Sequence, residues 1–295
     1  MSSPVPGLPD QLFQHFGRAG LQRFSRADLV GAQMPGSARA FLESTGVPQS
    51  VAPYFQGRGL TESVALGVVA AQELQLRVPA EFERWLRIGC DGRAHLCVRP
   101  NGVVEAVLLV EGGEDMFVNS DVHAFAASLL ALDRAQPLVA ASSGLQEAAK
   151  VFRDLNAELR GIDRQAFAER ESWWPRVLDD VRHTLNFPFS AAFEYVDEMG
   201  SRQTVTESTG PGLRHPEEIL WQRLSASGVQ PRQVRRVYCE LEPCLMPGHY
   251  CALWLQATFP HAEFTHSFDY GSTAESREAG LQELIRHAAE QARRQ

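Results

Sequence analysis

The spacing of hydrophobic residues changes along this chain and predicts two regions of different architecture. In the first region, short helical patterns over 8–60 precede four brief apolar runs over 85–119, which the turn signals DG, PNG and GGED separate. Such runs predict an antiparallel meander. Apolar residues then recur at helical spacing over 121–135, 144–160 and 164–186, so the first region is expected to be α+β.

The second region opens with FSAAFEYVDEMG and SRQTVTES, which predict a hairpin that turns at residues 199–201. A helix is expected from His215 to Gly228, followed by the strand QVRRVYCEL, a helix from about Gly248, the strand AEFTHSFDY and a last amphipathic helix. The predicted order is β-β-α-β-α-β-α. This alternation favours an α/β sheet covered by helices, with functional sites at strand ends and helix N-termini.

Length and composition narrow the class of protein. The 295 residues are enough for two domains, which we expect to span 1–186 and 187–295. No apolar run approaches the roughly eighteen residues that span a bilayer, and the start of the chain lacks a signal-peptide pattern, so we expect a cytoplasmic protein with no membrane contact. The net charge of −8 disfavours a protein that coats nucleic acid non-specifically.

Five cysteines argue against a disulfide framework and for metal binding, catalysis or burial. Three of them, Cys239, Cys244 and Cys251, fall within thirteen residues, downstream of His215-Pro216-Glu217. Each feature alone has an ordinary explanation, because Pro and acidic residues suit a helix start and cysteines are often buried. Burial is our interpretation of the other two cysteines, which lie on the predicted meander.

The combination of these features points to zinc. A His that opens one helix and two Cys that open the next, with a strand of the same sheet between them, would bring three ligands together. Three protein ligands leave a fourth tetrahedral position for water, as in catalytic zinc sites. Glu217, two residues after His215, would reach that water and carry its proton. Ligand atoms of His215 and Cys244 that lie more than about 7 Å apart would exclude a shared zinc ion.

The same residues carry a resemblance to a known superfamily. Residues 187–295 resemble the zinc-dependent deaminases, which include cytidine deaminases, tRNA adenosine deaminases and bacterial toxin deaminases. His215-Pro216-Glu217 matches the His-x-Glu motif, and the stretch CELEPC from Cys239 resembles the Ser-Glu-x-x-Pro-Cys motif of the toxin-like branch. The resemblance implies a three-layer α/β fold, zinc ligands His215, Cys244 and Cys251, and Glu217 as the group that shuttles protons while activated water displaces ammonia.

The chain departs from this family at the second cysteine. The usual gap of two residues after the Pro-Cys step becomes six, LMPGHY, so Cys251 would bind zinc only if this segment bulges out as a loop. His249 within the segment is the alternative ligand. Cys239 is expected to face the core.

The first region resembles the fourth subgroup of the SUKH immunity-protein superfamily. The resemblance rests on FQHFGRAGLQRFSRADLV, ARAFLESTGVP, the meander, MFVNSDVHAFAASLLAL and IDRQAFAERESWWPRVLDDV, over roughly residues 8–186. It implies an α+β module that neutralises toxins through protein contacts and has no catalytic residues. We expect Trp85, Trp173 and Trp174 to pack in its core rather than to form an interface.

Two functions follow. One is hydrolytic deamination of a nucleobase in a nucleotide or nucleic acid, with cytosine expected and adenine as the alternative, in a bacterial toxin-immunity conflict system. The other is a non-catalytic immunity protein that binds a toxin and uses the deaminase-like half as a scaffold. Arg214, His249 and Tyr270 are the candidate substrate-binding residues, and the rims of the pocket are expected in the loop over 208–214 and in LMPGHY.

Overall fold

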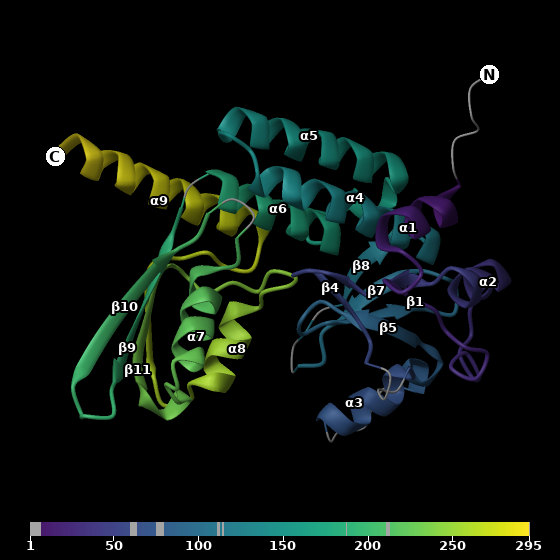
Figure 1. Cartoon of the computed structure of the whole chain (residues 1–295), viewed down its shortest axis with the longest axis horizontal. Coiled ribbons are helices and arrows are strands. Elements are labelled where there is room, and N and C mark those ends of the chain that lie inside the picture. The colour runs from purple at the N-terminus through teal and green to yellow at the C-terminus, as the bar shows by residue number, and fades with distance from the viewer. Residues whose placement is uncertain are drawn as a thin grey trace. The chain divides into compact units, whose positions relative to one another are not determined.

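The computed structural model describes residues 7–59, 64–74, 80–110, 113, 115–186, 188–210 and 213–294 (Figure 1). The chain packs as two compact units. One comprises Met1–Leu138 with Lys150–Pro175, and the other comprises Val139–Ala149 with Arg176–Gln295. Residues 176–186 therefore pack with the second unit, whereas the domain boundary expected from the sequence at 186 stays a prediction.

The first unit is built around a six-stranded sheet. Its strand order is β3-β4-β5-β6-β7-β8 and every neighbouring pair is antiparallel, which confirms the predicted meander. Glycines with positive φ at the β5–β6 and β6–β7 turns, Gly92 and Gly102, explain why DG and NG mark these positions. The elements up to this unit's last short helix are α1 (Leu8–Phe16), β1 (Leu21–Gln22), α2 (Gly36–Ser44), β2 (Val47–Pro48), β3 (Ser50–Val51), β4 (Phe55–Gly57), α3 (Leu66–Leu74), η1 (Ala80–Arg84), β5 (Leu86–Cys90), β6 (His95–Val98), β7 (Val104–Val107), β8 (Met116–Asn119), α4 (Val122–Ala140), α5 (Leu145–Ile162) and η2 (Gln165–Phe167).

Three tryptophans pack in the core of the first unit, as the sequence predicts: Trp85, Trp173 and Trp174 are all buried. The indole N–H of Trp173 donates to Asp91 at 2.7 Å and that of Trp174 donates to Asn119 at 2.8 Å. Buried indole groups need such partners because an unpaired N–H in the core is costly.

The predicted helix over 164–186 begins later than expected, at Trp173 (α6, Trp173–Asn186). The preceding chain turns through a short 3-10 helix instead. The reason is tertiary, because the carboxylate of Asp163 accepts the N–H groups of Ser120 and Gln165 and so fastens this segment to the end of β8.

The second unit contains most of α6 and a four-stranded sheet with the order β10-β9-β11-β12. Its strands are antiparallel except for the parallel pair β11–β12. The hairpin turns where predicted: Asp197 accepts the N–H groups of Met199 and Ser201, and Gly200 has a positive φ. After α6 the elements are β9 (Ser190–Val196), β10 (Arg202–Ser208), α7 (Pro216–Ala226), η3 (Pro231–Gln233), β11 (Val234–Leu241), α8 (Cys251–Thr258), β12 (Glu263–Phe268) and α9 (Ala274–Arg294).

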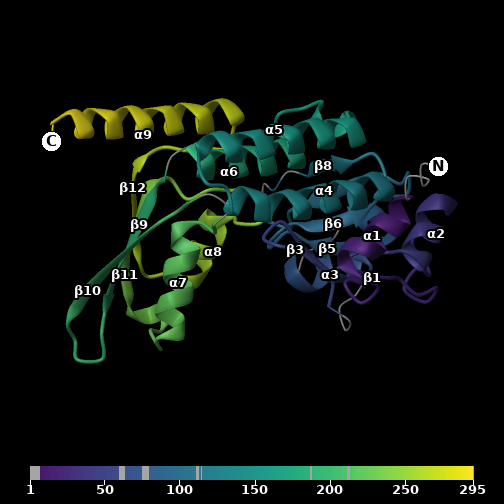
Figure 2. The same ribbon diagram turned by 45° about the horizontal axis from the view of Figure 1, so that its top comes forward.

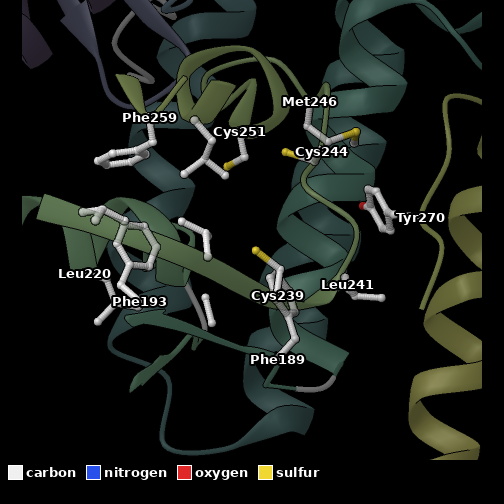
Figure 3. Close-up of a cluster of buried hydrophobic side chains, with 14 of the residues drawn as sticks. Phe189, Phe193, Leu220, Cys239, Leu241, Cys244, Met246, Cys251, Phe259 and Tyr270 are labelled. Carbon is white, nitrogen blue, oxygen red and sulfur yellow. The ribbon is translucent and has the colours of Figure 1, made fainter. Parts of the chain in front are cut away.

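Helices α7 and α8 lie side by side against this sheet in both views (Figure 1 and Figure 2). Alternate residues of β9 and β11 face them and form the core, together with Leu220 of α7 and Phe259 after α8 (Figure 3). The ring of Phe193 packs edge-on against Phe259 at 5.6 Å. This packing brings the N-termini of α7 and α8 to the end of β11, where α/β folds commonly place their sites. Among the described residues, no helix is long and apolar enough to cross a membrane.

Candidate metal centre

His215 occupies the N-cap position of α7, with extended φ and ψ of −62° and 147°. Pro216 follows at the first helical position, where a missing N–H costs nothing. The Glu218 carboxylate accepts the backbone N–H of His215 at 3.1 Å, the reciprocal half of a capping box. The helix start therefore holds the His215 side chain inside the unit, with Glu217 beside it.

The six residues between Cys244 and Cys251 fold into a tight turn. The carbonyl of Met246 accepts the N–H groups of His249 and Tyr250, and the carbonyl of Cys244 accepts the N–H of Ala252 at 3.0 Å. Tyr250, immediately before α8, adopts a left-handed backbone conformation with a φ of 44°. The segment is thus the bulge that Cys251 would need, and α8 begins at Cys251 rather than near Gly248 as the sequence suggested.

His215, Cys244 and Cys251 converge through this turn. Nδ1 of His215 lies 3.5 Å from Sγ of Cys244 and 3.4 Å from Sγ of Cys251, and all three donor atoms lie within 4.8 Å of one another. Tetrahedral zinc with bonds of about 2.0–2.3 Å places nitrogen and sulfur donors about 3.6 Å apart. The donor set therefore fits a zinc ion and satisfies the distance limit set from the sequence. Figure 3 shows Cys244 and Cys251 near each other, and Cys239 apart from them on β11.

Charge also favours a cation here. Burial opposes ionisation of Cys244, but the Cys251 thiol and the cationic ring of His215 hold the pKa of Cys244 well below its usual value. Burial likewise opposes ionisation of Asp180, yet His249 and His215 hold its pKa well below the usual range. Buried thiolate and carboxylate groups require a positive partner, which a histidinium or a metal ion supplies.

Glu217 is buried beside this cluster and has an unused oxygen. Burial raises the pKa of its carboxyl group, although His215 opposes that effect. The nearby thiol of Cys239 also opposes the rise in the pKa of Glu217. Oε2 has no hydrogen-bond partner among the described residues. Glu217 lines a small pocket whose other lining residues include His183, Phe189 and Tyr270. A carboxyl group in this setting is suited to accepting and returning a proton.

The three predicted substrate residues lie in different surroundings. Tyr270 is buried, lines the same pocket as Glu217 and bonds through its hydroxyl to Nδ1 of His183 at 2.5 Å. Arg214 is exposed just before α7, in a loop of which residues 211–212 lie outside the described residues. His249 was expected on a rim of the pocket, but it does not lie there. It is buried, and its ring stacks on that of His215 with centroids 3.8 Å apart.

Asp180 of α6 is the residue that the sequence did not indicate. Oδ1 lies 3.0 Å from Nε2 of His215, and Oδ2 lies 3.1 Å from Nε2 of His249. No signal in the helix WWPRVLDDVRHTLN distinguishes Asp180 from Asp179, because only the helix rotation decides which carboxylate faces the site. Asp180, His215 and His249 form a second group whose ligand atoms lie within 4.8 Å of one another.

Comparison with known families gives two matches that follow each other along the chain. The profile described as SUKH-4 immunity protein matches residues 8–180, and the profile described as Xanthomonas-like deaminase matches residues 188–287. No curated protein and no solved structure matches the chain. Since the first match alone covers more than half of the sequence, the chain belongs to the SUKH-4 immunity protein family, with a deaminase-like domain fused after the immunity domain.

Proposed function

We propose that this protein is a zinc-dependent hydrolytic deaminase of nucleobases joined to an immunity domain. The domains are assigned as residues 1–186 and 187–295. The observation that carries the proposal is the meeting of His215 Nδ1, Cys244 Sγ and Cys251 Sγ beside the unpaired oxygen of Glu217. The match to deaminases over residues 188–287 supports the same reaction class.

His215, Cys244 and Cys251 would hold the ion, and Glu217 would handle protons. Bound zinc would supply Lewis acidity and lower the pKa of a water ligand to about 7. The buried carboxylate of Glu217 accepts a proton from the attacking water and delivers it to the departing amine, so that one water is consumed and one ammonia is released.

The substrate is a nucleotide or nucleic acid, with cytosine as the expected base and adenine as the alternative. Phe189 and Tyr270 line the pocket, whose volume of about 10 Å³ holds no more than a water molecule, so a base would stack on these rings only after the pocket widens. Arg214, exposed at the entry to α7, is assigned to a phosphate group of the substrate. We assign the protein to the bacterial cytoplasm, as a component of a toxin-immunity system.

Ammonia release tests the proposed reaction. The zinc-loaded protein is incubated with cytidine, adenosine, their nucleotides, and single- and double-stranded nucleic acids. Glu217→Gln should lower the rate by at least about 100-fold with unchanged zinc content, since general acid–base catalysis commonly contributes 10²–10⁴. The control Glu240→Gln removes a carboxylate of the same unit that instead accepts the backbone N–H of Ser190. The proposal is wrong if the zinc-loaded protein releases ammonia from none of these substrates.

The SUKH-4 match favours a second function, toxin neutralisation by the immunity domain. Such a domain implies a toxin partner bound through protein contacts. Co-expression with a panel of nuclease and deaminase toxin domains, measured as rescue of growth, tests this function. Rescue that survives Glu217→Gln would assign it to binding, whereas rescue that requires Glu217 would assign it to the deaminase chemistry.

A further inference from the structure

Asp180 connects two imidazoles that the chain supplies from distant positions. It lies on α6, 35 residues before His215, and only 2% of its surface is exposed. One carboxylate oxygen faces Nε2 of His215 and the other faces Nε2 of His249. A carboxylate buried this deeply must be paired on both oxygens, and these two rings provide the pairing.

This contact determines which nitrogen of His215 faces the cysteines. A neutral imidazole carries one N–H, so a ring that donates from Nε2 to Asp180 keeps the lone pair of Nδ1 for another partner. Nδ1 is the atom that lies 3.4 and 3.5 Å from the two sulfur atoms. Histidines that bind metals commonly donate their other N–H to a carboxylate in this manner, which orients the ring and strengthens the ligand.

His249 completes the arrangement from the other side of Asp180. Its Nδ1 lies 2.6 Å from Oε2 of Glu218, the oxygen that also accepts the backbone N–H of His215. The side chains of Glu218, His249, Asp180 and His215 therefore form a continuous chain, of which Glu218 is partly exposed and the other three are buried. His249 reaches this chain of side chains because it lies in the long segment between Cys244 and Cys251.

We propose that Asp180 is a positioning residue for the candidate metal centre, which it serves by presenting Nδ1 of His215 to an ion held with Cys244 and Cys251. The inference rests on the proposed function. His249 supports Asp180 through the second oxygen and is not itself a ligand. The deaminase match begins at residue 188, so the centre depends on a helix that precedes the matched segment.

Zinc affinity of the full-length protein tests this role without a substrate. Asp180→Asn preserves the size of the side chain and removes its charge, and should weaken zinc binding about 10- to 100-fold, the usual effect of losing such a carboxylate. The control Asp179→Asn alters the neighbouring residue on α6, whose carboxylate instead pairs with Arg182 and Arg277. It should leave zinc affinity unchanged. Asp180→Glu should recover part of the loss.

Competition with a chromophoric chelator gives the affinities, and absorption of the cobalt-substituted protein reports the ligand geometry. Asp180→Asn should also alter the cobalt spectrum, which a general loss of stability would not do. Unchanged zinc affinity and an unchanged cobalt spectrum in folded Asp180→Asn would overturn the proposal. If that variant does not fold, His249→Gln decides, because unaltered zinc affinity there would overturn it equally.

Two further outcomes separate this inference from the proposed function. If the unaltered protein binds no zinc, the proposed function fails. If it binds zinc and releases ammonia while Asp180→Asn binds zinc equally well, only the role of Asp180 fails. Two zinc ions per chain, one of them lost with His249→Gln, would overturn the positioning role in favour of a second metal at Asp180, His215 and His249.

Discussion

Protonation of His183 should make the second unit less stable in mild acid. This imidazole is buried on α6, where desolvation and the adjacent Arg182 guanidinium lower its pKa from 6.5 to about 4. Nη2 of Arg182 lies 3.2 Å from Nε2, and the Tyr270 hydroxyl bonds to Nδ1. A proton on Nε2 would break the first bond and place two cations together. The native protein therefore keeps the ring neutral at a pH where the unfolded chain has already protonated it.

The magnitude follows from that difference. Between pH 6.5 and about 4 the unfolded state binds more protons than the native state, so the free energy of unfolding falls as the pH falls through this window. At about 1.4 kcal/mol per pH unit, the full loss is about 3 kcal/mol. By the same relation, about 2 kcal/mol of it is lost between about pH 7.5 and about pH 5. Well above pH 6.5 both states are neutral at this group, and it contributes no pH dependence there.

Urea unfolding measured by circular dichroism at several pH values checks this prediction. His183→Gln removes the titrating group and keeps a side chain that can bond to Tyr270. The loss of stability between neutral pH and about pH 5 should then be about 2 kcal/mol smaller in the variant than in the unaltered protein. His261→Gln, which removes an exposed imidazole of the same unit, should have no such effect. Other buried groups titrate in all three proteins, so they cancel in the difference. Equal pH dependence in His183→Gln and the unaltered protein would refute the reasoning.

Three further predictions concern the metal and the core. Purified protein should contain about one zinc per chain by mass spectrometry, and Cys244→Ser should lose it while Cys90→Ser retains it; equal zinc in both variants would contradict the ligand assignment. Phe193→Ala should cost about 3–5 kcal/mol in urea unfolding, because it empties the contact with Phe259, and Phe264→Ala on the exposed strand β12 should cost much less. Gly280→Ala should destabilise the protein although Ala favours helices by about 1 kcal/mol, because its Cβ would lie 1.8 Å from the carbonyl oxygen of Asp269. Gly161→Ala in α5, where a Cβ meets nothing within 4 Å, should be neutral or stabilising, and the same sign in both variants would contradict this account.

Local patterns in the sequence determine several features of this protein. The four-strand meander, the hairpin turn at residues 199–201 and the start of α7 at His215 all appear where the sequence predicts them. Each depends on interactions between residues that are close in the chain: alternation along a strand, glycine in a turn, and proline with acidic residues at a helix start. The His-x-Glu and Pro-Cys motifs can also be recognised from the sequence alone, and they identified three of the residues that meet at the candidate metal centre.

Tertiary packing decided the rest. The sequence left the position of Cys251 open, because a six-residue gap either separates two cysteines or folds back between them, and the turn around the Met246 carbonyl determines which. It indicated nothing about Asp180, since the rotation of α6 is set by its contacts with the second unit and not by its own pattern. For His249 it suggested a surface loop, whereas stacking on His215 and pairing with two carboxylates bury the ring. The contacts of Asp180 and His249 depend on partners at least 31 residues away along the chain. The sequence alone therefore determines the elements and the ligand types, and the folded chain determines which side chains meet.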